Sequence, residues 1–450
     1  MGNLLERIKS VGTGIGNEFL CIGDDGVKIS RITLNNYRSF NNITIDLNGD
    51  SVVIFGENGV GKSSVLHAIN LLFIRILYSI VQEKTKPTIY IQTGDIKNGG
   101  DECNIEVDFD IAGKSYSFAR NIKRDGHGEY KRKNLESIVR EFRSDFLESD
   151  SSNMPIFVNY GIHRLVLDIP LRIRQRHIFD KRSALTKAID NKIDFRTFFE
   201  WFRYQEDLEN EIIIEKKDFM YRDRALQAVR ESVQAMLDYA GDLHIERHPL
   251  TMVIKKDGER IAVNQLSDGE KCTLALFGDL SRRLALANPS LENPNHGKGI
   301  VLIDEVELHM HPRWQRRIIP VLKRTFPNIQ FIITTHSPQV LGEVGDGFKI
   351  YSMQKDGNDV ILGELPRLDG WDSNEILETL MRTAHINKET ERCFEQIFDC
   401  LENGDYEEAK KHLDSIQNRM SGKNPKLLRA KMILQMETLG YDIHKKNSRD

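Results

Sequence analysis

The feature that most constrains this chain is the stretch IFGENGVGKSSVL from Ile54, where an apolar run gives way to glycines, a lysine and two serines before apolar residues resume. Short β-branched runs precede it, and apolar residues at helical spacing follow it over 63–81. The spacing G-x-x-x-x-G-K-S from Gly56 is the P-loop pattern, which requires a strand before it and a helix after it. The stretch therefore predicts a nucleotide site; the alternative is a chance glycine turn before a helix.

The residue types in this loop suit phosphate chemistry. Glycines let backbone N–H groups approach phosphate oxygens, and the N-terminus of the following helix adds a favourable dipole. Lys62 supplies a positive charge for the β and γ phosphates, and Ser63 can hold Mg²⁺. The nucleotide-binding residues predicted in the loop are Gly56, Asn58, Gly59, Gly61, Lys62, Ser63 and Ser64.

A second segment, GIVLIDE at 299–305, places two acids at the end of a short apolar run. This run and IQFIITT at 329–335 have the composition of buried parallel strands. Asp304 can join Ser63 in the metal shell, and Glu305 can polarise an attacking water. Paired carboxylates downstream of a P-loop predict hydrolysis in addition to binding, although two acids could also simply begin a surface loop.

The composition is that of an ordinary globular protein. Hydrophobic residues make up 40% of the 450 residues, and the net charge is −4, so a nucleic acid would have to meet a local basic patch. Five cysteines without a CxxC pair argue against a zinc knot or disulfide framework and for a reducing cytosol. The run LLFIRILYSIV contains Arg75 and is too short for a bilayer, so we expect a cytoplasmic protein with no membrane partner.

The chain divides by pattern into four parts. Short β-branched runs dominate 1–124, a charge-dense stretch covers 125–245, strands and a helix return over 246–368, and 369–450 is helical. We expect the first and third parts to be two lobes of one α/β domain, with a mixed sheet and helices. The second part is expected to be a mainly helical insertion and the last a helical region with two helices around a turn at 403–405.

LSDGEK at 266–271 puts a serine and a glycine at the mouth of a predicted helix, which makes a second anion-binding terminus. Alone, it could be an ordinary N-capped helix. Beside the P-loop and the acid-ended strand, it resembles the signature motif of ABC-type ATPases, in the branch that contains SMC, RecF, Rad50 and OLD proteins. The resemblance implies an ABC-type P-loop ATPase head in which Ser267 and Gly269 of one subunit complete the ATP site of another.

Further stretches resemble the same branch. ITLNNYRSF is similar to its first strand and arm, which implies that Arg38 approaches the nucleotide phosphates, although a solvated surface arginine is the alternative. ITTHSPQVL puts His336 at the position of the family's switch histidine, which senses the γ phosphate; a structural histidine is the alternative. DEVELHMHP resembles a loop that lines the OLD subunit interface, and a zinc site there is disfavoured. Gln205 is a guess for the Q-loop glutamine, with a solvated helix face the favoured alternative.

The insertion and the tail narrow the resemblance. Sustained heptads are missing, unlike in SMC proteins, and no DxD follows the switch histidine, unlike in OLD nucleases, so we expect an ATPase that is not itself a nuclease. FVNYGIHR, DFRTFFEWFRYQEDLENE and the helical tail resemble the PtuA ATPases of Septu and retron-linked anti-phage systems. This resemblance implies a PtuB-like HNH nuclease docked on the C-terminal region, and ATPase dimers assembled into larger oligomers.

Two other functions stay open. One is a RecF-like DNA-repair ATPase without a nuclease partner, and the other, disfavoured by the opening arm, is a transporter ATPase. Nucleic acid, either DNA or a retron RNA/DNA, could be tracked by basic clusters that could equally be solvated surface. These clusters are Arg172, Arg174, Arg176, His177, Lys181 and Arg182, and Lys131, Arg132 and Lys133.

Overall fold

The structure is a computed structural model of the 450-residue chain. The chain separates into two compact units, Met1–Trp371 and Asp372–Asp450, which are described separately. The residues that the structure describes are 26–81, 90–128, 132–149, 151–162, 164, 179–368, 370–381, 388–417 and 426–436.

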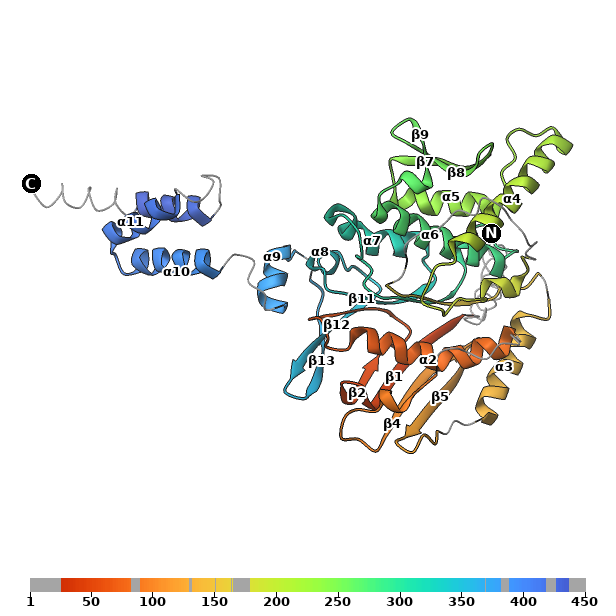
Figure 1. Ribbon diagram of the computed structural model, residues 1–450, viewed down its shortest axis with the longest axis horizontal. Coiled ribbons are helices and arrows are strands. Elements are labelled where there is room, and N and C mark those ends of the chain that lie inside the picture. The colour runs from red at the N-terminus through yellow and green to blue at the C-terminus, as the bar shows by residue number, and fades with distance from the viewer. Residues whose placement is uncertain are drawn as a thin grey trace, which may run out of the picture. The chain divides into compact units, whose positions relative to one another are not determined.

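A six-stranded sheet in the order β13-β12-β3-β11-β10-β6 forms the centre of the first unit (Figure 1). Its strands from β12 to β6 run parallel, and β13 pairs antiparallel with β12. Every residue of β6, β10 and β11 is buried, as expected for parallel strands covered on both faces, so the prediction for 299–305 and 329–335 is confirmed. The strands are β3 (Ser51–Gly56), β6 (Ile156–Tyr160), β10 (Gly299–Ile303), β11 (Ile329–Thr335), β12 (Phe348–Asp356) and β13 (Asp359–Leu365).

A four-stranded antiparallel sheet, in the order β2-β1-β4-β5, lies next to it in the same unit. Residues of β4 alternate between buried and more exposed positions, which is the pattern of a strand with one face on the core. Ala112 and Gly113 turn the β4–β5 hairpin with φ of 48° and 77°, the conformation that a tight hairpin turn needs. The strands are β1 (Val27–Tyr37), β2 (Phe40–Asp46), β4 (Glu102–Ile111) and β5 (Lys114–Lys123).

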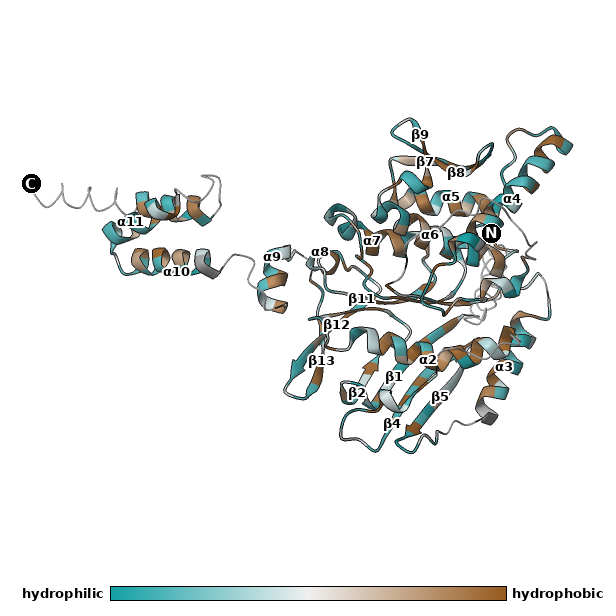
Figure 2. Cartoon of the chain, in the orientation of Figure 1, coloured by the Kyte–Doolittle hydropathy of each residue, from teal (hydrophilic) through white to brown (hydrophobic). Residues whose placement is uncertain are grey.

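Helix α2 (Lys62–Val81) packs between these two sheets, because it contacts β3 and β11 on one side and β4 and β5 on the other. It is hydrophobic along most of its length (Figure 2). By length and composition it could cross a membrane, and it is the one described helix that could. However, 67% of its apolar window is buried inside the fold, as in a core helix.

The other face of the six-stranded sheet carries α5, α6 and α7 (Figure 1). A small antiparallel sheet of β7, β8 and β9 adjoins these helices. The elements of this part are α4 (Phe195–Lys216), α5 (Arg224–Met236), β7 (Ala240–Arg247), β8 (Leu250–Lys256), β9 (Glu259–Ala262), α6 (Asp268–Ala287), α7 (Pro312–Thr325) and α8 (Pro338–Leu341).

The segment expected to be a mainly helical insertion, 125–245, contains α3 (Arg132–Phe146), α4 and α5. It also contains β6, which pairs with β10 and so belongs to the central sheet. Part of this segment is therefore core of the first unit. The division into 1–124, 125–245, 246–368 and 369–450 stays a prediction.

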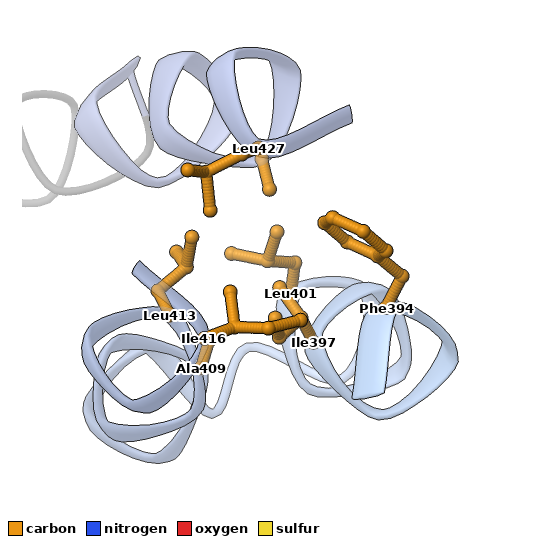
Figure 3. Close-up of a cluster of buried hydrophobic side chains, with 8 residues drawn as sticks. Phe394, Ile397, Leu401, Ala409, Leu413, Ile416 and Leu427 are labelled. Carbon is orange, nitrogen blue, oxygen red and sulfur yellow. The ribbon is translucent and has the colours of Figure 1, made fainter. Parts of the chain in front are cut away.

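The second unit is helical where the structure describes it, with α9 (Ser373–Glu375), a π-helical turn (Ile376–Leu380), α10 (Lys388–Glu402), α11 (Tyr406–Gln417) and a helix over 426–436. The predicted pair of helices around a turn at 403–405 is confirmed. Figure 3 shows side chains of α10, α11 and the last helix facing one another in a small apolar core. Cys393 and Cys400 are free thiols packed against this core.

Candidate nucleotide-binding site

The predicted P-loop joins the end of β3 to the start of α2, as the sequence pattern required. Gly56 has φ of 153°, and a Cβ there would lie 2.2 Å from the carbonyl oxygen of Met353 on the neighbouring β12. Gly61 has φ of 108°, and a Cβ there would lie 2.6 Å from Cζ of Phe40. Both positions therefore need glycine, because the backbone is crowded and adopts angles that other residues avoid.

Lys62 is buried at the base of the loop, with only 6% of the residue exposed. Its ammonium group donates hydrogen bonds to the carbonyl oxygens of Gly56 and Glu57, both at 2.8 Å. Burial lowers the pKa of Lys62, and the nearby carboxylates of Glu305, Glu307 and Asp304 oppose this. The loop thus holds a positive charge beneath the exposed residues Asn58, Gly59 and Ser63.

Two hydroxyl groups from distant segments meet on one carboxylate oxygen. Ser63 Oγ on α2 donates to Asp304 Oδ1 at 3.0 Å, and Thr334 Oγ1 on β11 donates to the same atom at 2.5 Å. A serine hydroxyl and a carboxylate suit Mg²⁺, which takes few protein ligands and completes its shell with water and substrate phosphates. Among the described residues, no group of three or more His, Cys, Asp or Glu could hold a metal by itself.

Glu305 directly follows Asp304 and adopts a left-handed conformation, with φ of 46°. Both polar groups of its main chain are bonded: its N–H donates to Thr334 Oγ1 at 2.9 Å, and its carbonyl accepts from Arg164 Nη2 at 2.5 Å. Within the described part of the chain, its side-chain carboxylate accepts no hydrogen bond. A half-buried carboxylate in this position can act on a water molecule.

His336 lies just past β11 and is tied to Glu307. The backbone N–H of His336 donates to Glu307 Oε1 at 2.7 Å, and its ring Nε2 lies 3.5 Å from the same atom. Thr335 Oγ1 donates to the other carboxylate oxygen at 2.8 Å. Glu307 therefore positions the segment that carries the histidine.

Arg38 lies at the turn between β1 and β2, beside the P-loop helix. Its Nε donates to Asp95 Oδ1 at 2.9 Å, and its Nη1 donates to Ser64 Oγ at 3.4 Å. Its side chain is 34% exposed, so it is neither fully solvated nor buried. The structure brings Arg38 and Ser64 together, and it adds Asp95, which no sequence pattern indicated.

Ser267 is the N-cap of α6, on the other face of the central sheet from α2 (Figure 1). Its hydroxyl and its N–H donate to Glu270 Oε2 at 2.6 and 2.8 Å. Gly269 packs so closely that a Cβ would lie 2.4 Å from the carbonyl oxygen of His309. The residues around Ser267 line an open hollow of about 860 Å³ with the loop after β10 and with Tyr239 and Trp314.

Glu270 completes this helix start. Burial acts to raise its pKa, but hydrogen bonds from Lys256, Ser267 and Tyr239 outweigh burial and bring the pKa to about 2. Lys256 Nζ and the Tyr239 hydroxyl donate to Glu270 Oε1 at 2.7 and 2.5 Å. Glu270 is therefore an ionised, buried partner of the cap, and only the S-x-x-E spacing in the sequence could have suggested it.

Gln205 and Lys181 do not join the site. Gln205 lies on α4, which packs against α5, α6 and β7, and the described hydrogen bonds around the P-loop do not include it. Lys181 of the first basic cluster donates to the carbonyl oxygens of Phe146 and Ser149, so it serves the fold. Outside the described residues lie Arg172, Arg174, Arg176 and His177 and the side chains of Lys131, Arg132 and Lys133.

Comparison with known proteins places this chain in a family. The family described as "AAA domain, putative AbiEii toxin, Type IV TA system" matches residues 51–342, from the start of β3 through α8. "Retron Ec83 probable ATPase" of Escherichia coli is 30% identical over 378 residues, which are 70% of this chain and 69% of that protein. "Retron Vc95 probable ATPase" of Vibrio cholerae serotype O1 biovar El Tor is 30% identical over 398 residues, 76% of this chain and 77% of that protein.

A third relative, "Septu protein PtuA" of Bacillus mycoides (strain KBAB4), is 25% identical over 404 residues, 87% of this chain and 50% of that protein. Among solved structures, an SMC head domain from Pyrococcus furiosus, bound to the C-terminal domain of ScpA, matches with a TM-score of 0.47 and 16% identity. That match covers 75% of this chain and 96% of the other.

The α/β fold and the residues around Lys62 agree with these matches. The family match covers more than half of the chain, and two relatives named as ATPases match over more than two thirds of their length. The chain therefore belongs to the family of AAA-domain proteins described above, as an ATPase of the PtuA-like group found in Septu and retron defence systems.

Proposed function

We propose that the chain binds and hydrolyses ATP between two copies of itself, and that this cycle controls a PtuB-like HNH nuclease. Lys62 and the P-loop hold the phosphates, Ser63 and Asp304 hold Mg²⁺, and Glu305 polarises the attacking water. Arg38 and His336 contact the phosphates. Ser267 and Gly269 of a second copy close the site.

The observation that carries this proposal is the separation of two anion-binding helix starts in one chain. The groups needed for hydrolysis gather around the ends of β3, β10 and β11, where Ser63 contacts Asp304. The start of α6 instead lines a separate hollow, whose lining residues include none of the P-loop. A second copy can bring that hollow to the first copy's P-loop, and this supports a shared site.

Glu305→Gln tests the shared site. The variant keeps the shape of the side chain but removes the base, so we expect hydrolysis to fall by about 100-fold or more. ATP should then stabilise a dimer, seen as a doubling of mass by light scattering. Lys62→Ala is the control and should show no ATP-dependent change of mass. Hydrolysis at the wild-type rate by Glu305→Gln, or an unchanged mass with ATP, contradicts the proposal.

Substitutions in the second unit test the proposed nuclease partner. The helix over 426–436 exposes Leu428, Met432 and Met436 at a spacing of four, with exposures of 45%, 59% and 67%. An apolar stripe of this kind supports a docked helix or groove. We expect the chain to co-purify with an HNH protein encoded beside it, and Met432→Glu to lose it while ATP hydrolysis is kept. Lys431→Glu on the same helix is the matched control. If duplex DNA stimulates hydrolysis and no nuclease binds, the RecF-like function is favoured instead.

A further inference from the structure

Arg164 is a buried arginine that the sequence reasoning assigned no role. It follows β6, which pairs in parallel with β10 so that Tyr160 lies opposite Ile303. The N–H of Asp304 donates to the carbonyl of Tyr160 at 2.9 Å, which continues this pairing past the end of β10. Parallel strands end at the same edge of a sheet, so the pairing carries Arg164 and Glu305 to one place.

The guanidinium of Arg164 holds the main chain of Glu305. Nη2 donates to the Glu305 carbonyl at 2.5 Å, and Arg164 is only 2% exposed. Burial lowers the pKa of Arg164, and the carboxylates of Glu307, Asp304 and Glu305 partly oppose this. Among the residues that the structure describes, its Nη1 finds no acceptor. A buried, partly unsatisfied arginine contributes less to folding than an apolar residue of similar size.

The backbone conformation of Glu305 indicates what the buried Arg164 does. Its left-handed φ of 46° is unfavourable for a residue with a side chain, and it persists only when its surroundings fix it. Thr334 holds its N–H and Arg164 holds its carbonyl, so the two peptide groups that flank its Cα are both pinned. These two bonds determine the direction in which the carboxylate leaves the backbone.

We propose that Arg164 is a positioning residue for hydrolysis, which fixes the Glu305 carboxylate on the water that attacks the γ phosphorus. The proposal rests on the proposed role of Glu305. In the reaction the water oxygen bonds to the γ phosphorus and the bond from that phosphorus to the β–γ bridging oxygen breaks. ADP leaves with the electron pair, and Glu305 takes the water proton and returns it to phosphate or solvent. A small displacement of the base is enough to slow such a step strongly.

The first test replaces Arg164 by Met, which keeps the volume and removes the donors, and by Lys, which keeps one donor. We expect Arg164→Met to lower kcat by about 10- to 100-fold while the Kd for ATP changes by less than about two-fold. Arg164→Lys should recover part of the loss. Arg120→Met, at another buried arginine on β5, measures the general cost of losing such a side chain. A Kd for ATP raised about ten-fold would overturn the proposal, because it would make Arg164 a phosphate ligand.

The second test combines Arg164→Met with Glu305→Gln. If Arg164 acts through Glu305, the double variant hydrolyses ATP no more slowly than Glu305→Gln alone, because residues that act as a unit are not additive. Additive losses would overturn the proposal, as would full activity of Arg164→Met beside an inactive Glu305→Gln. Wild-type activity of Glu305→Gln itself would instead refute the proposed function. Should Arg164→Met fail to fold, Arg164→Lys in the same two backgrounds gives the same comparison.

Discussion

The starts of α2 and α6 are both helix N-termini next to glycines, but they differ in what already occupies them. Helix α2 has no acidic residue in its first turn, whereas α6 has Asp268 and Glu270 there. A helix N-terminus presents unpaired N–H groups and a partial positive charge. At α2 these remain for a phosphate, and Lys62 adds a full charge. At α6 a buried carboxylate already bonds the cap, and the acids offset the dipole.

Because of this difference, only one of the two helix starts can attract ATP unaided. Glu270 is ionised at neutral pH and bonded by Tyr239 and Lys256, so the start of α6 already holds one of the chain's own acids. It can add the exposed hydroxyl of Ser267 and nearby backbone N–H groups to a phosphate that another surface delivers. We therefore expect affinity for ATP to depend on α2, and assembly to depend on α6.

Lys62→Ala is the strongest test of this division. It removes the buried charge of the loop, so we expect affinity for ATP to fall by about 100-fold or more, since hydrogen bonds from a charged group to phosphate are among the strongest in proteins. Binding is measured by calorimetry on the full chain. Lys349→Ala is the control. Lys349 lies at the end of β12 that is away from the P-loop, and it donates to the carbonyl of Asp46. Equal effects of the two substitutions would remove the distinction between the helix starts.

The features predicted from the sequence were those set by short, continuous patterns. The P-loop, β10 and β11 are each encoded within about a dozen neighbouring residues. Strand β6 was missed because IFVNY is too short to show a period, and its place in the sheet depends on pairing with β10, more than a hundred residues away. The sequence of a charge-dense stretch cannot show a partner so distant.

The site was predicted less completely for the same reason. Ser63 and Asp304 are proposed ligands from separate motifs, and the structure brings them to 3.0 Å, although their role as Mg²⁺ ligands stays a proposal. Thr334 and Arg164 act through contacts to residues that are 30 and 141 positions away. Threonine and arginine are common residues, so their types alone indicate no role. Thr334 and Arg164 reach Asp304 and Glu305 only because neighbouring strands end at the same edge of the sheet.

Ser267→Arg tests whether assembly depends on the start of α6. A long side chain at this exposed cap would block a second copy but leave the loop at Lys62 intact. We expect the ATP-dependent doubling of mass to disappear and hydrolysis to fall about ten-fold, with affinity for ATP within about two-fold of wild type. Ser290→Arg, at another exposed serine, is the control. Weaker ATP binding by the isolated chain would show that α6 also serves the nucleotide of its own chain.

Glu270→Gln is expected to have the smallest effect, which appears in stability and depends on pH. The folded pKa of Glu270, about 2, is below its ordinary value of 4.5. Its ionised form therefore stabilises the fold fully above pH 4.5, and this contribution is lost as the pH falls towards 2.

Glutamine keeps the shape of the side chain but presents an amide to Lys256. The free energy of unfolding at pH 7 should therefore fall by about 1–3 kcal/mol. The difference in the free energy of unfolding between wild type and variant, measured by urea unfolding, should become smaller below pH 4.5. Glu259→Gln, at an exposed carboxylate of β9, should show almost no gap at any pH. A gap for Glu270→Gln that is the same at pH 7 and pH 3.5 would mean that the charge of Glu270 does not hold the start of α6. The acidic cap would then not explain why the two helix starts differ.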